Sequence, residues 1–457
     1  MNSEKNVELE TMPIGKLLFK LALPAIVAQM INALYNIVDR MYIGHIEGSG
    51  ALALTGVGIT FPIIMIISAF AALVGMGGSP LVAIRLGEKD RKGAEGILGN
   101  ATMMILILSV VLTTLFLIFQ RPLLMAFGAS ENTVEYAIQY LTIYLCGTIF
   151  VQITLGLNAF INTQGFAKIG MYTVLIGAVL NIVLDPIFIF VFGMGVRGAA
   201  LATIISQAVS AIWVFNFLMG KKTTIKIRKP EMRLKKEYVF GIISLGISPF
   251  IMQSTESLLN ITLNASLQSY GGDLAVGAMT IIGSISQMGL MPLMGLTQGG
   301  QPIISYNYGA KNFDRVRKAY KLMIVSSFAL SMLIWGIVEL FPSAVISIFT
   351  TDPELMNLTT WAIRIFMMCV GMMGLQTGCQ QTFLSLGQAK ISVFLAMLRK
   401  LILLIPLILI IPRVTGLGIT GVFLAQPIAD FFAVLTTVIV FMIQIKKIIP
   451  KENNKVV

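Results

Sequence analysis

Charged residues, histidine and cysteine are scarce in this sequence. Asp, Glu, Lys and Arg make up only 12% of its 457 residues, whereas the hydrophobic types make up 56%. A soluble domain is about one-quarter charged and about 45–50% apolar, so this chain cannot cover itself with a polar surface. Its three cysteines, Cys146, Cys369 and Cys379, lie in apolar runs and show no metal-binding spacing. They exclude a disulfide framework and predict buried residues that pack between helices.

Motifs for catalysis and for nucleotide binding are also missing. The sequence contains no HExxH, no GxSxG and no GxxxxGK[ST]. This absence argues against an intramembrane enzyme and against ATP as the energy source within this chain. We therefore expect no cofactor, and we expect an ion gradient to supply the energy for any active process.

Twelve apolar stretches follow one another along the chain. A helix needs about 20 apolar residues to cross the hydrocarbon core of a bilayer. The predicted spans cover roughly 16–43, 51–79, 96–119, 137–161, 169–192, 197–219, 239–267, 274–303, 320–341, 356–384, 391–411 and 416–445. The fold class that we predict is an all-α polytopic membrane protein with 12 transmembrane helices.

The positions of the basic residues predict the orientation of these spans. With the N-terminus in the cytoplasm, 26 of the 33 Lys and Arg residues fall on the cytoplasmic side and 3 fall outside. The other four lie within spans: Arg40, Arg364, Arg399 and Lys400. Basic loops mark the cytoplasmic side of membrane proteins. We therefore expect a multi-pass membrane protein with both termini in the cytoplasm, embedded in the lipid bilayer and without a nucleic-acid partner, although the net charge is +12.

The two halves of the chain match each other at a shift near 222 residues. Gly87 corresponds to Gly309, and Gly165 corresponds to Gly387. Each half holds six predicted spans, so both halves enter the membrane from the same side. Such parallel repeats are related by a pseudo-two-fold axis along the membrane normal.

The repeat and the charge pattern predict two lobes. We expect an N-terminal lobe over 1–219, a solvated and strongly basic cytoplasmic linker over 220–237, and a C-terminal lobe over 238–457. Two lobes of six helices are typical of a transporter whose central cavity opens to alternate sides.

Acidic and polar residues at membrane depth are candidate functional residues, because their burial in lipid is costly. At 1.5 Å per residue, Asp39, Asp185 and Thr203 lie roughly 6, 10 and 9 Å below the outer ends of their spans. Asn181 is one helical turn from Asp185 and points the same way. Their oxygens suit a small hard cation, and two close carboxylates could instead hold a proton. These four residues predict a site for H⁺ or Na⁺, although they could also only satisfy one another within the bundle.

The C-terminal lobe holds different charges. The positions that the repeat aligns with Asp39 and Asp185 carry no acid there, so this type of cation site belongs to the N-terminal lobe only. Glu256 and Asp430 lie near mid-membrane instead and would attract a cationic substrate into the cavity. Alternatively, they are neutral or paired packing residues. Their candidate partners are Arg364, Arg399 and Lys400.

Several segments together resemble the multidrug and toxic compound extrusion (MATE) family, and most of all its MepA-type bacterial branch, which has DinF- and NorM-type relatives. These segments are LALPAIVAQM, YNIVDRMYIG, GVGIT, LNIVLDPIFIF, VRGAALATIISQ, ISPFIMQ and GLGITGVFLAQ. The resemblance covers nearly the whole chain. It implies a secondary antiporter of the bacterial cytoplasmic membrane that exports cationic and amphipathic drugs in exchange for H⁺ or Na⁺, and we expect it to act as a monomer.

The resemblance also implies roles for single residues. The cation site would consist of Asp39, Asn181, Asp185 and Thr203. Helix 1 would bend at Pro24, Asn158 resembles a pocket residue of the family, and Glu256 resembles the acid on helix 7 of its NorM-type members. Tyr35 lies one turn from Asp39 and would share the pocket.

Three alternatives stay open at this point. A lipid-linked saccharide flippase of the same broad superfamily would need a more cationic cavity, which the basic residues at 364, 399 and 400 would allow. The span count alone also fits the major facilitator type, but the quoted segments do not. The sequence does not distinguish H⁺ from Na⁺, because the same oxygen ligands suit both.

Overall fold

The computed structural model describes residues 8–46, 50–350 and 352–450, and this part of the chain is helical without any β-strand. Lys5, Lys451 and Lys455, which the charge pattern assigns to the cytoplasmic side, lie outside it. The helices are α2 (Ile14–Gly44), α3 (Gly50–Gly87), α4 (Arg91–Ala126), α5 (Val134–Cys146), α6 (Thr148–Thr163), α7 (Ala167–Pro186), η1 (Ile187–Val191), α8 (Val196–Met219), η2 (Lys229–Met232), α9 (Lys236–Gly309), α10 (Phe313–Leu340), α11 (Pro342–Ile346), α12 (Pro353–Phe366), α13 (Val370–Ser385), α14 (Ala389–Met397), η3 (Leu398–Leu404), α15 (Ile405–Thr415) and α16 (Ile419–Ile448).

The twelve predicted spans are confirmed if two bent helix pairs each count as one span. By length and composition, ten helices of the described chain could cross a membrane by themselves. The fourth span is formed by α5 and α6, which are bent by 58° at Gly147, and the tenth by α12 and α13, which are bent by 45°. The long helix α9 contains the seventh and eighth spans, which separate at Gly272, where φ is 62°.

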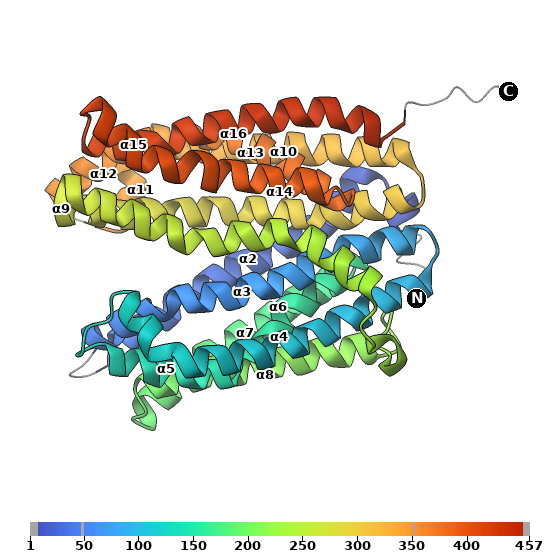
Figure 1. Cartoon of the computed structure of the whole chain (residues 1–457), viewed down its shortest axis with the longest axis horizontal. Coiled ribbons are helices and arrows are strands. Elements are labelled where there is room, and N and C mark those ends of the chain that lie inside the picture. The colour runs from blue at the N-terminus through green and yellow to red at the C-terminus, as the bar shows by residue number, and fades with distance from the viewer. Residues whose placement is uncertain (1–7, 47–49, 351, 451–457) are drawn as a thin grey trace.

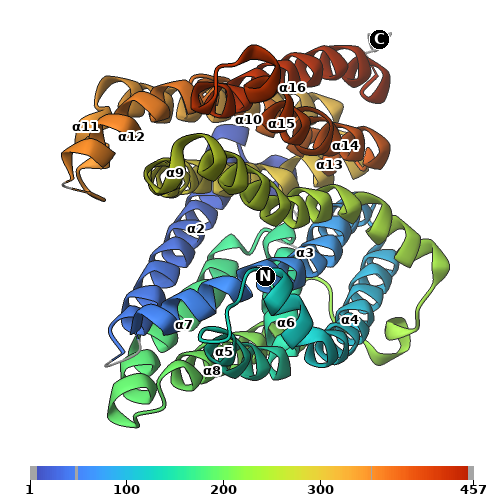
Figure 2. The same ribbon diagram turned by 60° about the vertical axis from the view of Figure 1, so that its left-hand side comes forward.

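The helices form two lobes that lie side by side. The helices of the N-terminal half, α2 to α8, make one layer, and those of the C-terminal half, α9 to α16, make the other (Figures 1 and 2). Within the C-terminal lobe, helix α9 faces the N-terminal lobe and packs against its helices α2 and α3. Because each half has six spans, α2 begins and α16 ends at the same end of the bundle (Figure 1). We call this end, which also carries residues 220–235, the linker end.

The backbone repeats its unusual conformations at the predicted shift of 222 residues. Only Lys89 and Lys311 among the described non-glycine residues have positive φ, at 62° and 56°. Gly165 and Gly387 repeat in the same way, at 84° and 72°. Positive φ is strained for a residue with a side chain, so its recurrence at equivalent turns shows that the two halves share one local design.

The lobes touch through equivalent glycines at the linker end. A Cβ atom on Gly87 would collide with the carbonyl oxygen of Tyr306, and one on Gly309 would collide with that of Ile84. The two contacts exchange under the 222-residue shift, as an isologous contact around a two-fold axis requires. The pseudo-two-fold axis therefore passes between these ends of α3 and α9, where only glycine lets the backbones approach so closely.

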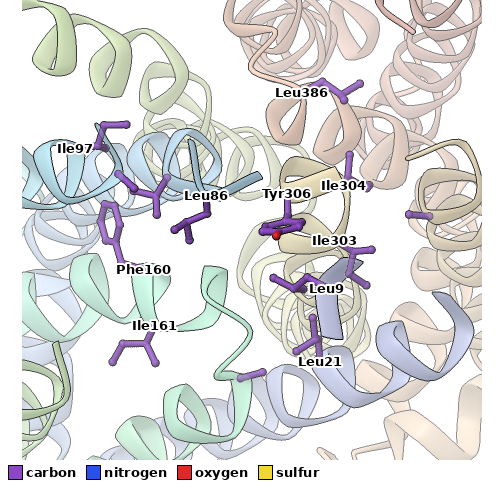
Figure 3. Close-up of a cluster of buried hydrophobic side chains, with 14 of the residues drawn as sticks. Leu9, Leu21, Leu86, Ile97, Phe160, Ile161, Ile303, Ile304, Tyr306 and Leu386 are labelled. Atoms are coloured by element: carbon purple, nitrogen blue, oxygen red, sulfur yellow. The ribbon is translucent and has the colours of Figure 1, made fainter. Parts of the chain in front are cut away.

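The segment before α2 also contacts both lobes. Leu9 packs in one hydrophobic cluster with Leu86 of the N-terminal lobe and with Tyr306 of the C-terminal lobe (Figure 3). Arg315 donates hydrogen bonds to the carbonyl oxygens of Leu9 at 3.1 Å and of Met12 at 2.7 Å. The contacts at the linker end thus include this segment as well as the long helices.

The linker, predicted to be solvated, is exposed only in part. Its basic side chains are mostly exposed, but Thr223 and Ile225 are completely buried. The side-chain oxygen of Gln164 accepts hydrogen bonds from the Thr223 hydroxyl at 2.8 Å and from the backbone nitrogens of Thr224 and Ile225 at 2.8 and 3.1 Å. The first part of the linker is therefore attached to the loop between α6 and α7, because a short buried backbone segment needs partners for its polar groups.

The cysteine prediction was right for one residue only. Cys379 is buried, Cys369 is half-buried, and Cys146 is exposed. All three are free thiols. An apolar run does not decide which residues face lipid and which face neighbouring helices, so the sequence pattern could not separate these cases.

Candidate functional site

Three helices of the N-terminal lobe bring the four predicted cation-site residues together. Asn181 on α7 donates hydrogen bonds to a carboxylate oxygen of Asp185 at 3.2 Å and to the hydroxyl of Thr203 on α8 at 3.3 Å. Asp39 on α2 lies within hydrogen-bonding reach of Asp185. All four side chains are buried, so the cluster is closed off within the described chain.

Local helix geometry aims these side chains at one another. Asn181 and Asp185 lie four residues apart on α7 and therefore on the same face. Directly after them, Pro186 removes a backbone donor, and the chain continues as the π-helix η1 over Ile187–Val191. Such wider turns are frequent at functional sites, and here the turn lies at the end of the helix that carries Asp185.

Three oxygens of the cluster lack partners. Asp39 Oδ1, Asn181 Oδ1 and Asp185 Oδ2 are buried and have no hydrogen-bond partner among the described residues. A buried unpaired oxygen costs about 1–3 kcal/mol, and more when it is charged. A proton shared by the two carboxyl groups, or a small cation bound by oxygens of the cluster, would supply partners that the described residues lack, so the residues present fit the predicted H⁺ or Na⁺.

Tyrosines surround this cluster. Tyr35 lies close enough to Asp39 and Asp185 to interact with both electrostatically, so it belongs with the predicted cation site. Tyr140 on α5 lies beside Thr203, and its ring stacks on that of Tyr144 with centroids 6.2 Å apart. The sequence reasoning missed Tyr140 and Tyr144. The sequence feature that could have indicated them is two tyrosines one helical turn apart in an apolar span.

Two other predicted residues lie away from this cluster. Asn158 donates a hydrogen bond to the carbonyl oxygen of Gly170 at 3.2 Å. Gly170 precedes Asn181 on α7 by about 16 Å at 1.5 Å per residue, so the structure does not bring Asn158 to the acids. Pro24 is buried within α2, which continues as a helix through it.

The C-terminal lobe pairs its acids with basic side chains. Lys400 forms an ion pair with Glu256, and Arg399 forms one with Asp430 at 2.8 Å. Of the interpretations that the sequence left open, the geometry therefore matches paired residues rather than free acids. Arg364, the third candidate partner, lies near Glu339 instead.

Comparison with known proteins extends over both halves. The MatE family model matches residues 24–187 and 249–410. The multidrug export protein MepA of Staphylococcus haemolyticus is 27% identical over 433 residues, which are 94% of each chain. A multidrug resistance MATE family transporter in its outward-facing conformation matches with a TM-score of 0.89 at 26% identity, covering 97% of this chain and 98% of that one. A MOP superfamily transporter of Pyrococcus furiosus, described as having a binding pocket of reverse polarity, matches with a TM-score of 0.91 at 26% identity over 98% and 99% of the two chains.

Proposed function

The chain belongs to the MatE family, a family of multi-pass membrane transporters, and on this premise we propose that it is a multidrug efflux antiporter. It exports cationic and amphipathic compounds from a bacterial cell, as a monomer in the cytoplasmic membrane, in exchange for H⁺ or Na⁺. The observation that carries this proposal is the set of unpaired buried oxygens on Asp39, Asn181 and Asp185. A site with three unsatisfied oxygens in the membrane binds a proton or a cation far better than it stays empty.

Helix α2 connects the proposed cation site to the contact between the lobes. Near one end α2 carries Asp39, and near the other end its backbone at Ala22 and Ile26 lies against Gly299 and Gly295 of α9. Binding of a cation at Asp39 neutralises the cluster and repacks this end of α2. Because α2 is a single helix, the change reaches the contact with the C-terminal lobe and favours the state that releases the drug.

The coupling has a direction. The linker end is the cytoplasmic end in this proposal, because the basic residues concentrate there. Each elementary charge that moves inward down the membrane potential supplies about 2.3 kcal/mol per 100 mV. This energy drives export of the drug if the transporter carries the cation inward and the drug outward in alternate steps.

The flippase alternative loses its main support. It needs basic residues free to meet a pyrophosphate, but Arg399 and Lys400 are paired with Asp430 and Glu256. Paired charges of opposite sign give these four residues no net charge. We therefore retain efflux of organic cations as the proposed function.

Transport in reconstituted vesicles tests the proposal. Proteoliposomes are loaded with a cationic dye, and dye movement is followed under an imposed pH gradient or an imposed Na⁺ gradient, each applied separately. We expect one gradient to drive transport by the wild type and neither to drive it in Asp39→Asn. Glu135→Gln, which changes an exposed acid at the start of α5, is the matched control and should transport like the wild type. Normal coupled transport by Asp39→Asn would disprove the assignment of the coupling site.

A further inference from the structure

The seventh span, the first part of α9, exposes two different surfaces. Glu256, Asn260 and Asn264 are exposed at successive i, i+4 positions and form a polar stripe. Leu258 and Ile261 are exposed on a neighbouring face. Polar side chains at membrane depth face water or protein, whereas apolar ones face lipid. We therefore expect the polar stripe to face water rather than lipid, and Glu256 is its charged residue.

Lys400 reaches Glu256 from inside the C-terminal lobe. It lies in the π-helix η3 (Leu398–Leu404), and its ammonium donates a hydrogen bond to the carbonyl oxygen of Met252 at 2.7 Å as well as pairing with Glu256. The Lys400 side chain is only 10% exposed, whereas that of Glu256 is 48% exposed. One side of the carboxylate is thus held by Lys400, and the other side is open to the polar stripe.

The adjacent residue provides an internal comparison. Arg399 lies on the same π-helix and pairs with Asp430, whose side chain is 1% exposed. Gln426 donates a further hydrogen bond to the second oxygen of Asp430 at 3.0 Å. That acid has both oxygens occupied and no open side. Of the two acids in these neighbouring ion pairs, Glu256 is the one that a ligand can reach.

We propose that Lys400 is a tethered competitor at a cation subsite formed by Glu256. Its ammonium takes the position beside the carboxylate that a monovalent lipophilic organic cation would occupy, so Lys400 sets how tightly such cations bind. With Lys400 present the subsite is neutral, and an added cation leaves one positive charge without a partner in a poorly screened environment. Without it the subsite carries one negative charge, which matches a monocation. This inference deepens the proposed export of organic cations and rests on it.

Binding of tetraphenylphosphonium to the purified full-length protein tests this role. We expect Lys400→Met to bind it about tenfold more tightly than the wild type, a difference of about 1.4 kcal/mol. Lys400→Arg keeps the charge and should bind like the wild type. Arg399→Met is the matched control, because it removes a neighbouring positive charge whose acidic partner, Asp430, is buried. Its affinity for tetraphenylphosphonium should not increase. The double variant Lys400→Met with Glu256→Gln should also show no gain.

Several results would overturn the inference. The inference is contradicted if the Lys400→Met protein folds but binds tetraphenylphosphonium no more tightly than the wild type. It is also contradicted if the double variant still binds more tightly than the wild type. If Lys400→Met does not fold, acylation of Lys400 in the wild type, mapped by mass spectrometry, replaces this measurement. Tetraphenylphosphonium should speed acylation by displacing the ammonium, and an unchanged or slower rate would refute the competition. Absence of binding to the wild type and to every variant would instead refute the proposed function itself.

Discussion

Replacing Gly309 by alanine should separate the lobes at the linker end. Gly309 is at the end of α9, where it meets the backbone of α3. A Cβ at this position would lie 2.7 Å from the carbonyl carbon of Ile84 and 2.9 Å from its Cα, and closer still to the carbonyl oxygen. These atoms belong to a helix backbone, so no side-chain rotation can relieve the collision, and α3 and α9 must move apart.

The size of the effect follows from the cost of the collision. Extra atoms in a packed contact cost about 1–3 kcal/mol, and the upper value applies here because the obstacle is backbone. The greater helix stability of alanine is the same in the closed and open states and therefore does not offset this cost. The closed contact is then weakened by about 3 kcal/mol, which shifts the balance between the closed and open states of this end about 150-fold.

Distances between spin labels measure this shift. Lys92 on α4 and Lys318 on α10 are exposed, belong to different lobes and lie near the linker end. Labels at these two positions, in protein whose native cysteines are replaced, should show a longer distance population in Gly309→Ala. Gly283→Ala is the matched control, because it lies in the same helix and its Cβ would meet no atom within 4 Å. It should leave the distances unchanged.

The refuting result is specific. If Gly309→Ala and Gly283→Ala give the same distance distribution as the wild type, the close backbone approach does not hold this end closed. A longer population in both variants would also refute the reasoning, because it would trace the effect to helix stability rather than to the contact between α3 and α9.

Two further predictions concern the segments attached at the linker end. Gln164→Ala should lower the free energy of unfolding of the purified protein by about 3 kcal/mol, because the buried backbone nitrogens of Thr224 and Ile225 lose their acceptor; an unchanged melting temperature would show that this attachment is not needed. Arg315→Met should speed hydrogen exchange in the segment before α2 at least tenfold, because the carbonyl oxygens of Leu9 and Met12 lose their charged donor. Exchange as slow as in the wild type would show that apolar packing of Leu9 alone holds the segment.

Much of the fold could be predicted from the sequence, because the properties concerned are local. The length of each apolar stretch decides whether its helix crosses a bilayer, and the shift of 222 residues follows from the order of residues along the chain. The same holds for the i, i+4 relation of Asn181 and Asp185, which follows from the helical period. The two bends, at Gly147 in the fourth span and between α12 and α13 in the tenth, were not predicted, because a single hydrophobic run does not show where its helix changes direction.

The sequence by itself determined how deep each polar residue lies, since depth follows from the rise per residue along a helix. Only the tertiary structure decided which residues are neighbours in the plane of the membrane, because helix rotation and order depend on the packing of all spans at once. It placed Tyr140 beside Thr203 and paired Glu256 with Lys400, whose residue numbers differ by 144. The scarce charges were visible in the sequence as candidates, and their partners became visible only when the helices were packed.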